Sequence, residues 1–300
     1  MAGFTEYAVP NVSQGKDAKV IAAIAAALSA HGEVIDRHSD SVHNRTVFNL
    51  TAPQGRLVAG LASGARACIE QIDMRAHSGA HPSIGALDVC PVIWLSESQR
   101  PAAEALARET AEALAKLDLP VFLYGALATG PGQSERDYFR RGGFAALSER
   151  MASGDLVPDF GPRVAHETAG AVMVTARPPL AAFNVELDSG DVEIARAVAD
   201  ELRESGGGLQ GVRAIGVDLD GVAQVSTNVH DPIAITLGVV VERIRALAAA
   251  RGARPVAAEL VGLVPRAALG GLPPDVPLRD FDPDIHVIEA RVQTQSPSGR

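Results

Sequence analysis

The chain has 300 residues, 47% apolar and 21% charged, which is enough for one large domain or two of ordinary size with a buried core. Its formal net charge of −9, with no basic run, disfavours nucleic acid and membrane surfaces as partners. Two isolated cysteines exclude a disulfide framework and a paired-cysteine zinc site, and without a signal peptide or membrane-spanning stretch we expect a cytoplasmic protein.

The first half of the chain is predicted to run strand, helix, strand, strand, helix, strand. The spacing of apolar residues places these elements at 4–11, 16–30, 33–38, 44–52, 54–72 and 88–95. A helix at 100–117 and a strand at 120–125 follow. The segment 128–170 is rich in glycine, proline and charge, and we expect at most one short helix in it. Long irregular segments of this kind often carry function.

The second half of the chain repeats this order. Its strand, helix, hairpin, helix and strand are expected at 180–187, 191–205, 212–229, 233–250 and 254–261, and Asp220-Gly221 is the expected hairpin turn. Strand–helix–strand–strand–helix–strand is the split βαβ, or ferredoxin-like, order. Its duplication predicts an α/β fold of the α+β kind, with two ferredoxin-like subdomains forming a duplicated sandwich and a cleft between them. We expect an N-terminal subdomain at 1–170, a C-terminal subdomain at 171–285 and a polar tail at 286–300.

Four of the eight histidines gather between residues 38 and 81. Two of these, His77 and His81, lie in "RAHSGAHPSIGALDVCPVIWL", which leads into a predicted strand. Histidines four residues apart on a helix can chelate zinc, but three residues disfavour a helix in this stretch: Gly79, Pro82 and Gly85. The spacing leaves open a metal loop completed by Asp40 or Asp88, a catalytic loop, and an ordinary surface turn.

Eight short motifs occur in one order: "YAVPNVSQGK" (7–16), "HSDSVHNRTV" (38–47), "HSGAHPSIGALDVCP" (77–91), "LYG" (123–125), "PDFGP" (158–162), "AFNVEL" (182–187), "AQVSTN" (223–228) and "LVGLVP" (260–265). Together they resemble the glutamate formimidoyltransferase family, which includes the N-terminal half of formimidoyltransferase-cyclodeaminase. The resemblance covers about residues 4 to 268. It implies two ferredoxin-like subdomains, in agreement with the order of elements.

The resemblance also implies an activity. The formimino group of N-formimidoylglutamate moves to tetrahydrofolate, a folate co-substrate, in one-carbon metabolism and histidine catabolism, and no metal is required. His81 matches the catalytic histidine of the family. The folate-binding segment of the family matches Gly161, Pro162, Arg163, Val164, Ala165, His166, Glu167, Thr168, Ala169 and Gly170.

The chemistry of formimino transfer suits a histidine. One proton leaves the attacking amine and one joins the departing nitrogen, and a group with a pKa near 6.5 can carry both near neutral pH. We expect Asp40 or Asp88 to orient His81. As groups that contact the substrate we expect His43, Asn44, Arg45, His77, Tyr124, Arg140 and Arg141.

The sequence departs from the usual family pattern at several positions, among them Gln14, Ser83, Ala126, Gly143 and Ala169. Several of these changes remove charged groups, so the donor stays open between formimidoylglutamate and another formimino amino acid. The alternative functions are folate binding without activity and a His/Asp metal-dependent hydrolase. We expect small molecules as partners, and the sequence leaves a homodimer open.

Overall fold

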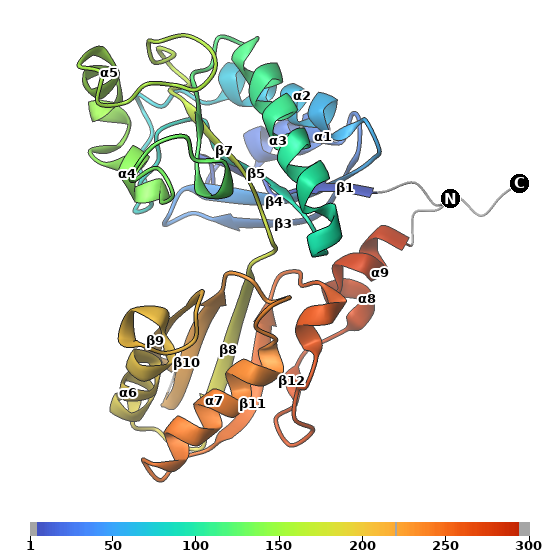
Figure 1. Cartoon of the computed structure of the whole chain (residues 1–300), viewed down its shortest axis with the longest axis vertical. Coiled ribbons are helices and arrows are strands. Elements are labelled where there is room, and N and C mark those ends of the chain that lie inside the picture. Colours follow the sequence, from blue (N-terminus) through green and yellow to red (C-terminus); the bar gives the residue numbers. More distant parts are fainter. Residues whose placement is uncertain (1–4, 220, 294–300) are drawn as a thin grey trace, which may run out of the picture. The chain divides into compact units, whose positions relative to one another are not determined.

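The computed structural model describes residues 5–219 and 221–293 of the chain. The chain divides after Arg177 into two compact units (Figure 1). Each unit has a sheet and buried apolar clusters of its own. Within the described ranges, no helix combines the length and the apolar character that a membrane span requires.

The first unit is built around one mixed sheet. Its described strands are β1 (Thr5–Ala8), β2 (Asn11–Val12), β3 (Glu33–Asp40), β4 (Arg45–Pro53), β5 (Leu87–Ile93), β6 (Val121–Leu123) and β7 (Val172–Arg177). Its described α-helices are α1 (Ala18–Leu28), α2 (Leu57–Gln71), α3 (Arg100–Ala115), α4 (Arg136–Arg140) and α5 (Gly143–Ala152).

Most of this sheet has the ferredoxin-like arrangement. Antiparallel pairing places β1 and β2 between β5 and β4, and β3 lies on the outer side of β4. This is the strand order of a split βαβ unit, so the ferredoxin-like prediction is confirmed for the first half. β7 and then β6 extend the sheet beyond β5 by parallel pairing.

The two faces of the first sheet are covered differently. Helices α1, α2 and α3 pack on one face, where Leu57 and Leu61 of α2 share a buried cluster with Phe48 of β4 (Figure 1). On the other face, Phe139 of α4 packs against Phe122 of β6, with ring centroids 5.3 Å apart. Polar side chains of β2, β4 and β5 occupy the same face as this second cluster, and they form the candidate site.

Two predictions for the first unit are wrong. The strand predicted at 4–11 is interrupted between β1 and β2, because Pro10 has no N–H to continue the ladder; residue 4 itself lies outside the described residues. The segment 128–170 contains two α-helices, α4 and α5, instead of at most one. The positive φ angles of Gly142 and Gly143, +77° and +62°, interrupt the helical run between them and leave two helices too short to show a clear period.

The end of the first unit also differs from the predicted boundary at 170. Residues 172–177 form β7, which was not predicted and which pairs with both β5 and β6. Val174 and Ala176 of β7 are buried in the cluster beneath α1–α3. The first unit therefore extends through Arg177.

The second unit repeats the ferredoxin-like order. Its described elements are β8 (Ala181–Leu187), α6 (Val192–Leu202), β9 (Val212–Leu219), β10 (Val222–Val229), α7 (Leu237–Ala249), β11 (Pro255–Val261), β12 (Leu278–Arg279), α8 (Pro283–His286) and α9 (Ile288–Gln293). The strands lie in the order β12–β11–β8–β10–β9, antiparallel except for the β11–β12 pair. The prediction is confirmed for this half too. Asp220 of the predicted turn lies outside the described residues.

Helices α6 and α7 contribute their apolar stripes to one core with β8, β10 and β11. The predicted polar tail at 286–300 is wrong in its first part. Val287 and Ile288 are fully buried, and α9 continues the fold to residue 293. Residues 294–300 lie outside the described residues.

Candidate active site

A β-bulge in β5 sets the position of Asp88. Asn11 of β2 pairs with Val89 and Val12 pairs with Leu87, so Asp88 has no partner across the ladder. Leu87 faces the core under α1–α3, while Val89 belongs to the cluster on the other face. The bulge lets Asp88 point to that second face as well.

Asp88 is a buried carboxylate with two partners. It pairs with Arg140 of α4, and it accepts a hydrogen bond of 2.8 Å from the backbone N–H of Ile84. Asp88 and Arg140 are only 3% and 7% exposed, so the pair ties α4 to β5 from within. Removing either partner would leave a buried charge uncompensated.

Asn44 joins three loops around this point. Its Oδ1 accepts a hydrogen bond of 2.8 Å from the N–H of Gly15, and its Nδ2 donates to the carbonyl of Ser78 at 3.0 Å. The same Nδ2 lies 3.3 Å from Nδ1 of His77. Asn44 has a φ of +50°, a conformation that asparagine tolerates better than most residues. Its role in this structure is to position the loops.

Close backbone contacts hold the histidine loop in place. A Cβ atom on Gly79 would lie 2.3 Å from the carbonyl oxygen of His43, so only glycine allows this approach. The N–H of Ala80 donates to the carbonyl of Val42 at 3.1 Å. Residues 77–84 contain no helix, which confirms the sequence-based argument against helical zinc chelation.

These loops and strands surround a small pocket. Its lining residues are Val12, Ser13, His43, Asn44, Arg45, His77, His81, Ser83 and Asp88. The rings of His43 and His81 meet edge to face, with centroids 6.4 Å apart. Across residues 5–219 and 221–293, no group of three or more His, Cys, Asp and Glu side chains is arranged to hold a metal ion.

The neighbour of His81 is a guanidinium group. Nη1 of Arg45 donates to Nε2 of His81 at 3.0 Å, and Nη2 of Arg45 donates to Oδ1 of Asn11. Nε2 must therefore be unprotonated. Burial, followed by the charges of Arg45 and Arg140, lowers the pKa of His81 from 6.5 to about 4, and Asp88 opposes the shift. At neutral pH the imidazole is neutral in this arrangement.

Asp40 orients a different histidine from the one expected. Its Oδ2 lies 2.7 Å from Nδ1 of His43, and its Oδ1 accepts hydrogen bonds of 2.8 Å from the N–H groups of Val42 and His43. These bonds, led by those of His43, lower the pKa of Asp40 to about 2. Within the described residues, neither Asp40 nor Asp88 bonds to His81, so its Nε2 has a guanidinium neighbour where the sequence suggested a carboxylate.

Arginines dominate the surroundings of the pocket. The charges of Arg45, Arg136 and Arg140 all act on His81, and those of Arg136, Arg140 and Arg177 act on buried Tyr124. Arg177 also forms a hydrogen bond with the Tyr124 side chain. Burial, then the charge of Arg140, lowers the pKa of Arg45 to about 10.

Sequence reasoning missed Arg136 and Arg177. The spacing of Arg136 and Arg140, four residues apart, would have indicated a shared helix face if α4 had been predicted. Arg177 lies at the end of β7, the strand that was not predicted. Arg141 is not among the residues that line the pocket, because its guanidinium group lies over the Tyr138 ring, 5.9 Å from its centroid.

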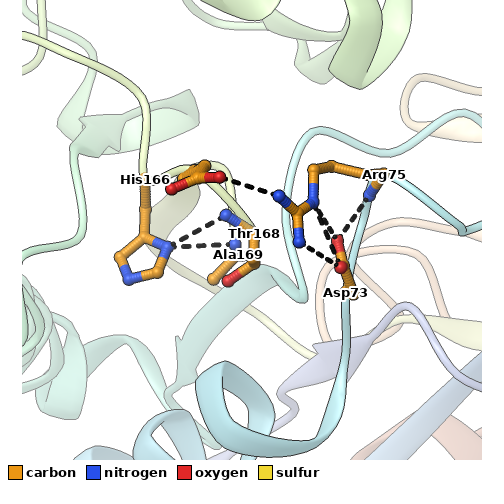
Figure 2. A network of polar contacts seen from close by, with 6 residues as sticks. Asp73, Arg75, His166, Thr168 and Ala169 are labelled. Carbon is orange, nitrogen blue, oxygen red and sulfur yellow. Dashed lines mark hydrogen bonds and ion pairs between the residues drawn. The ribbon is translucent and has the colours of Figure 1, made fainter.

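The segment 161–170 is tied to the start of the histidine loop (Figure 2). Arg75 forms ion pairs of 2.7 Å with both Asp73 and Glu167. The N–H of Met74 donates to the carbonyl of Thr168 at 2.8 Å. Nδ1 of His166 accepts hydrogen bonds from the backbone N–H groups of Thr168 and Ala169, at 3.3 and 3.1 Å.

The two ends of this segment have different exposure. Ala169 and Gly170 are buried, and a Cβ atom on Gly170 would lie 2.0 Å from the carbonyl oxygen of Ile84. Arg163 and Val164 are exposed, Val164 to 70%. The exposed part is thus accessible to a ligand, whereas the buried end packs against the chain just before β5.

One departure from the family pattern has a clear structural role. Oε1 of Gln14 accepts hydrogen bonds of 2.8 and 2.9 Å from the N–H groups of Lys16 and Asp17, just before α1. Ser83, another of these departures, lines the pocket. The structure gives no reason for Ala126.

Sequence comparison identifies the protein class to which this site belongs. The formiminotransferase domain, N-terminal subdomain, matches residues 6–177, and the formiminotransferase domain matches residues 182–271. These two matches cover the two structural units in order.

Curated relatives agree. Glutamate formimidoyltransferase of Streptococcus pyogenes serotype M1 is 36% identical over 266 residues, which cover 87% of this chain and 89% of that protein. The glutamate formimidoyltransferase of Thermoplasma acidophilum is 34% identical over 268 residues, covering 87% and 88%. Formimidoyltransferase-cyclodeaminase of Rattus norvegicus is 38% identical over 272 residues, but this chain spans only 50% of its length.

A small pocket that gathers titratable histidine, arginine and aspartate side chains, several with shifted pKa values, is a candidate active site. The chain belongs to the formiminotransferase family, and it is a one-carbon transferase that acts on formimino groups.

Proposed function

We propose that this protein transfers the formimino group of N-formimidoyl-L-glutamate, or of a related formimino amino acid, to tetrahydrofolate. The N5 amine of the folate forms a bond to the amidine carbon, and the bond from this carbon to the amino-acid nitrogen breaks. The products are 5-formimidoyltetrahydrofolate and the free amino acid. One proton leaves N5 and one joins the departing nitrogen, and His81 is the proposed carrier of both.

The observation that carries this proposal is the position of His81 in the pocket. Its imidazole is bonded to Arg45 and interacts electrostatically with Asp88. The imidazole is neutral, and its Nε2 can accept a proton from the attacking amine once Arg45 no longer donates to it. The depressed pKa makes it harder for His81 to donate a proton to the departing nitrogen. At a pKa near 4, only about one imidazole in a thousand is protonated at pH 7. Bound substrate must change the surroundings of His81 for it to donate efficiently.

Tetrahydrofolate fits the chemistry of the 161–170 segment. Arg163 offers a cation for a folate carboxylate, and exposed Val164 offers apolar surface for the aminobenzoyl ring. The ion pair between Arg75 and Glu167 joins this segment to the histidine loop, so a folate held there would lie on the loop that bears His81.

The experiment that tests the proposal is a transfer assay with tetrahydrofolate and a panel of formimino and formyl amino acids. We expect 5-formimidoyltetrahydrofolate to form, and His81→Ala to lower kcat by at least about a hundredfold with folding intact. His31→Gln is the matched control, since His31 lies at the other side of the unit and bonds to Arg56.

Two results would contradict this function. Folate binding without turnover of any donor in the panel would favour a binding protein. Activity that a chelator abolishes and zinc restores would favour a metal-dependent hydrolase.

A further inference from the structure

The arginines around the pocket carry more positive charge than their neighbours balance. Arg45 comes from β4, and Arg136 and Arg140 come from α4. The Asp88 carboxylate is already paired with Arg140. Among the described residues, neither Arg45 nor Arg136 forms an ion pair with an acidic side chain, and the guanidinium group of Arg136 makes no hydrogen bond.

Two of these guanidinium groups also have unused donors. The Nε atoms of Arg45 and Arg140 are buried and lack a hydrogen-bond partner in the part of the chain that the structure describes. A buried donor without a partner is unfavourable, and so are like charges held together away from water. Both costs disappear if an anion binds between these arginines.

We propose that Arg45, Arg136 and Arg140 form a subsite for the carboxylates of an acidic donor amino acid, and that the bound carboxylate withdraws Arg45 from Nε2 of His81. This inference rests on the proposed function and names its donor class. A carboxylate suits the arrangement because a guanidinium group donates two parallel hydrogen bonds to it.

The glutamate tail of a folate carries the same chemistry, but the geometry favours the donor. Arg45 touches His81, so the subsite borders the place of proton transfer. In a formimidoyl amino acid, one nitrogen and one carbon separate the reacting carbon from the α-carboxylate. In tetrahydrofolate, the whole aminobenzoyl group separates N5 from the glutamate.

The consequence of binding falls on His81. Among the described residues, the charged or titratable groups around it are Arg45 from β4, Asp88 from β5, Arg136 and Arg140 from α4, His43 from the β3–β4 turn and His77 from its own loop. A carboxylate on the arginines offsets their charges and frees the Nε2 lone pair. His81 then titrates closer to neutrality and can donate a proton as well as accept one.

Binding of glutarate, followed by calorimetry, tests the subsite without catalysis. We expect glutarate to bind more tightly than butyrate. We also expect Arg136→Gln to lower the affinity for glutarate by about tenfold or more. Arg136 is the chosen position because, across the described ranges, its guanidinium group makes no hydrogen bond or ion pair whose loss would destabilise the fold. Arg66→Gln, an exposed position on α2, is the matched control and should bind as the wild type does.

A second measurement follows His81 by NMR with isotope-labelled histidine, assigned by comparison with His81→Gln. Saturating glutarate should raise the pKa of His81 by at least about one unit. An unchanged titration, or equal glutarate affinity in the wild type and Arg136→Gln, would overturn the subsite.

Tetrahydrofolate binding separates the two sources of carboxylate. We expect Arg136→Gln to bind tetrahydrofolate within about twofold of the wild type. If tetrahydrofolate binding falls while glutarate binding is unchanged, the arginines serve the folate tail and the assignment to the donor is wrong. If glutarate binds and shifts His81 but no formimino transfer occurs, the subsite stands and the proposed function fails.

Discussion

Asn44 shows how one side chain can determine the geometry of a whole site. Its amide bonds the loop before α1 and the histidine loop, and Asn44 directly precedes Arg45, the first residue of β4. The sequence predicted that Asn44 contacts the substrate. In the structure, its amide oxygen and nitrogen already serve the loops that hold His77 and Arg45 in place.

Replacing Asn44 with alanine removes these hydrogen bonds and places alanine at a φ of +50°. We expect Asn44→Ala to lower the free energy of unfolding by about 2–4 kcal/mol, measured in urea. Asn228→Ala, at an exposed position of β10, is the control and should be near neutral. Equal stability of the two variants would contradict the role of Asn44.

The lowered pKa of His81 predicts a pH dependence of stability. The folded value near 4 lies below the ordinary 6.5, so between these values the unfolded chain binds more protons at this site than the folded one. The contribution of His81 to the free energy of unfolding is therefore fully present above pH 6.5 and is lost as the pH falls towards 4. His81→Gln should flatten the rise in unfolding free energy between pH 4.5 and 7. If the unfolding free energy of this variant had the same pH slope as that of the wild type, the pKa of His81 would not be depressed in the folded protein.

At the scale of elements, the N-terminus of α2 depends on a residue of a neighbouring strand. Oε1 of Glu6 in β1 accepts a hydrogen bond of 2.7 Å from the N–H of Gly55, and its Oε2 accepts one of 3.0 Å from that of Leu57. Arg56, at the N-cap position, provides no side-chain hydrogen bond of its own. Glu6 is buried, so it acts as the cap from outside the helix.

We expect Glu6→Gln to lower the free energy of unfolding by about 1–3 kcal/mol, because an amide has one acceptor oxygen where the carboxylate has two. Glu70→Gln provides the comparison, since Glu70 lies exposed near the other end of the same helix. Urea unfolding of both variants measures the difference. Similar effects at the two positions would argue against capping by Glu6.

The elements that the sequence predicts well are those with a long apolar period. The stripe of α2 and the alternation in β8 repeat often enough to identify both, with ends only a few residues from those observed. β7 and α4 have five or six residues each, too few for a period to emerge. Their places depend on pairing and packing with distant parts of the chain.

The candidate site is predictable to a similar extent. The sequence brings His81, His43, Arg45 and Asp88 together, and all four line one pocket. It does not reveal the bulge that turns Asp88, because a bulge depends on the register between two strands. Nor does it show that Asp40 bonds to His43 and Arg45 to His81, since side-chain partners depend on the folded loops.

At the scale of the whole molecule, each unit closes a core of its own. The second unit has both ferredoxin-like helices and a buried cluster built from its own strands. The chain between the units is short, from Arg177 at the end of β7 to Ala181 at the start of β8. The cleft that the sequence predicts between the two subdomains stays a prediction.

We expect residues 178–300 to fold when produced alone, with dispersed amide signals by NMR and one cooperative transition in urea. A shorter piece, 178–249, lacks β11, the strand beside β8, and should remain unfolded. If the 178–300 fragment showed no dispersed amide signals, the second unit would not fold independently of the first.

The place of β7 in the first sheet has a consequence for biosynthesis. β6 reaches this sheet through β7, yet β7 begins at Val172, long after β6 ends at Leu123. While the ribosome makes the residues between them, β6 waits without its partner strand and β5 presents an open edge for parallel pairing. A nascent chain that stops at residue 170 contains the whole histidine loop but cannot complete its sheet. The last six residues of the first unit thus determine when the unit that contains the candidate site can finish folding.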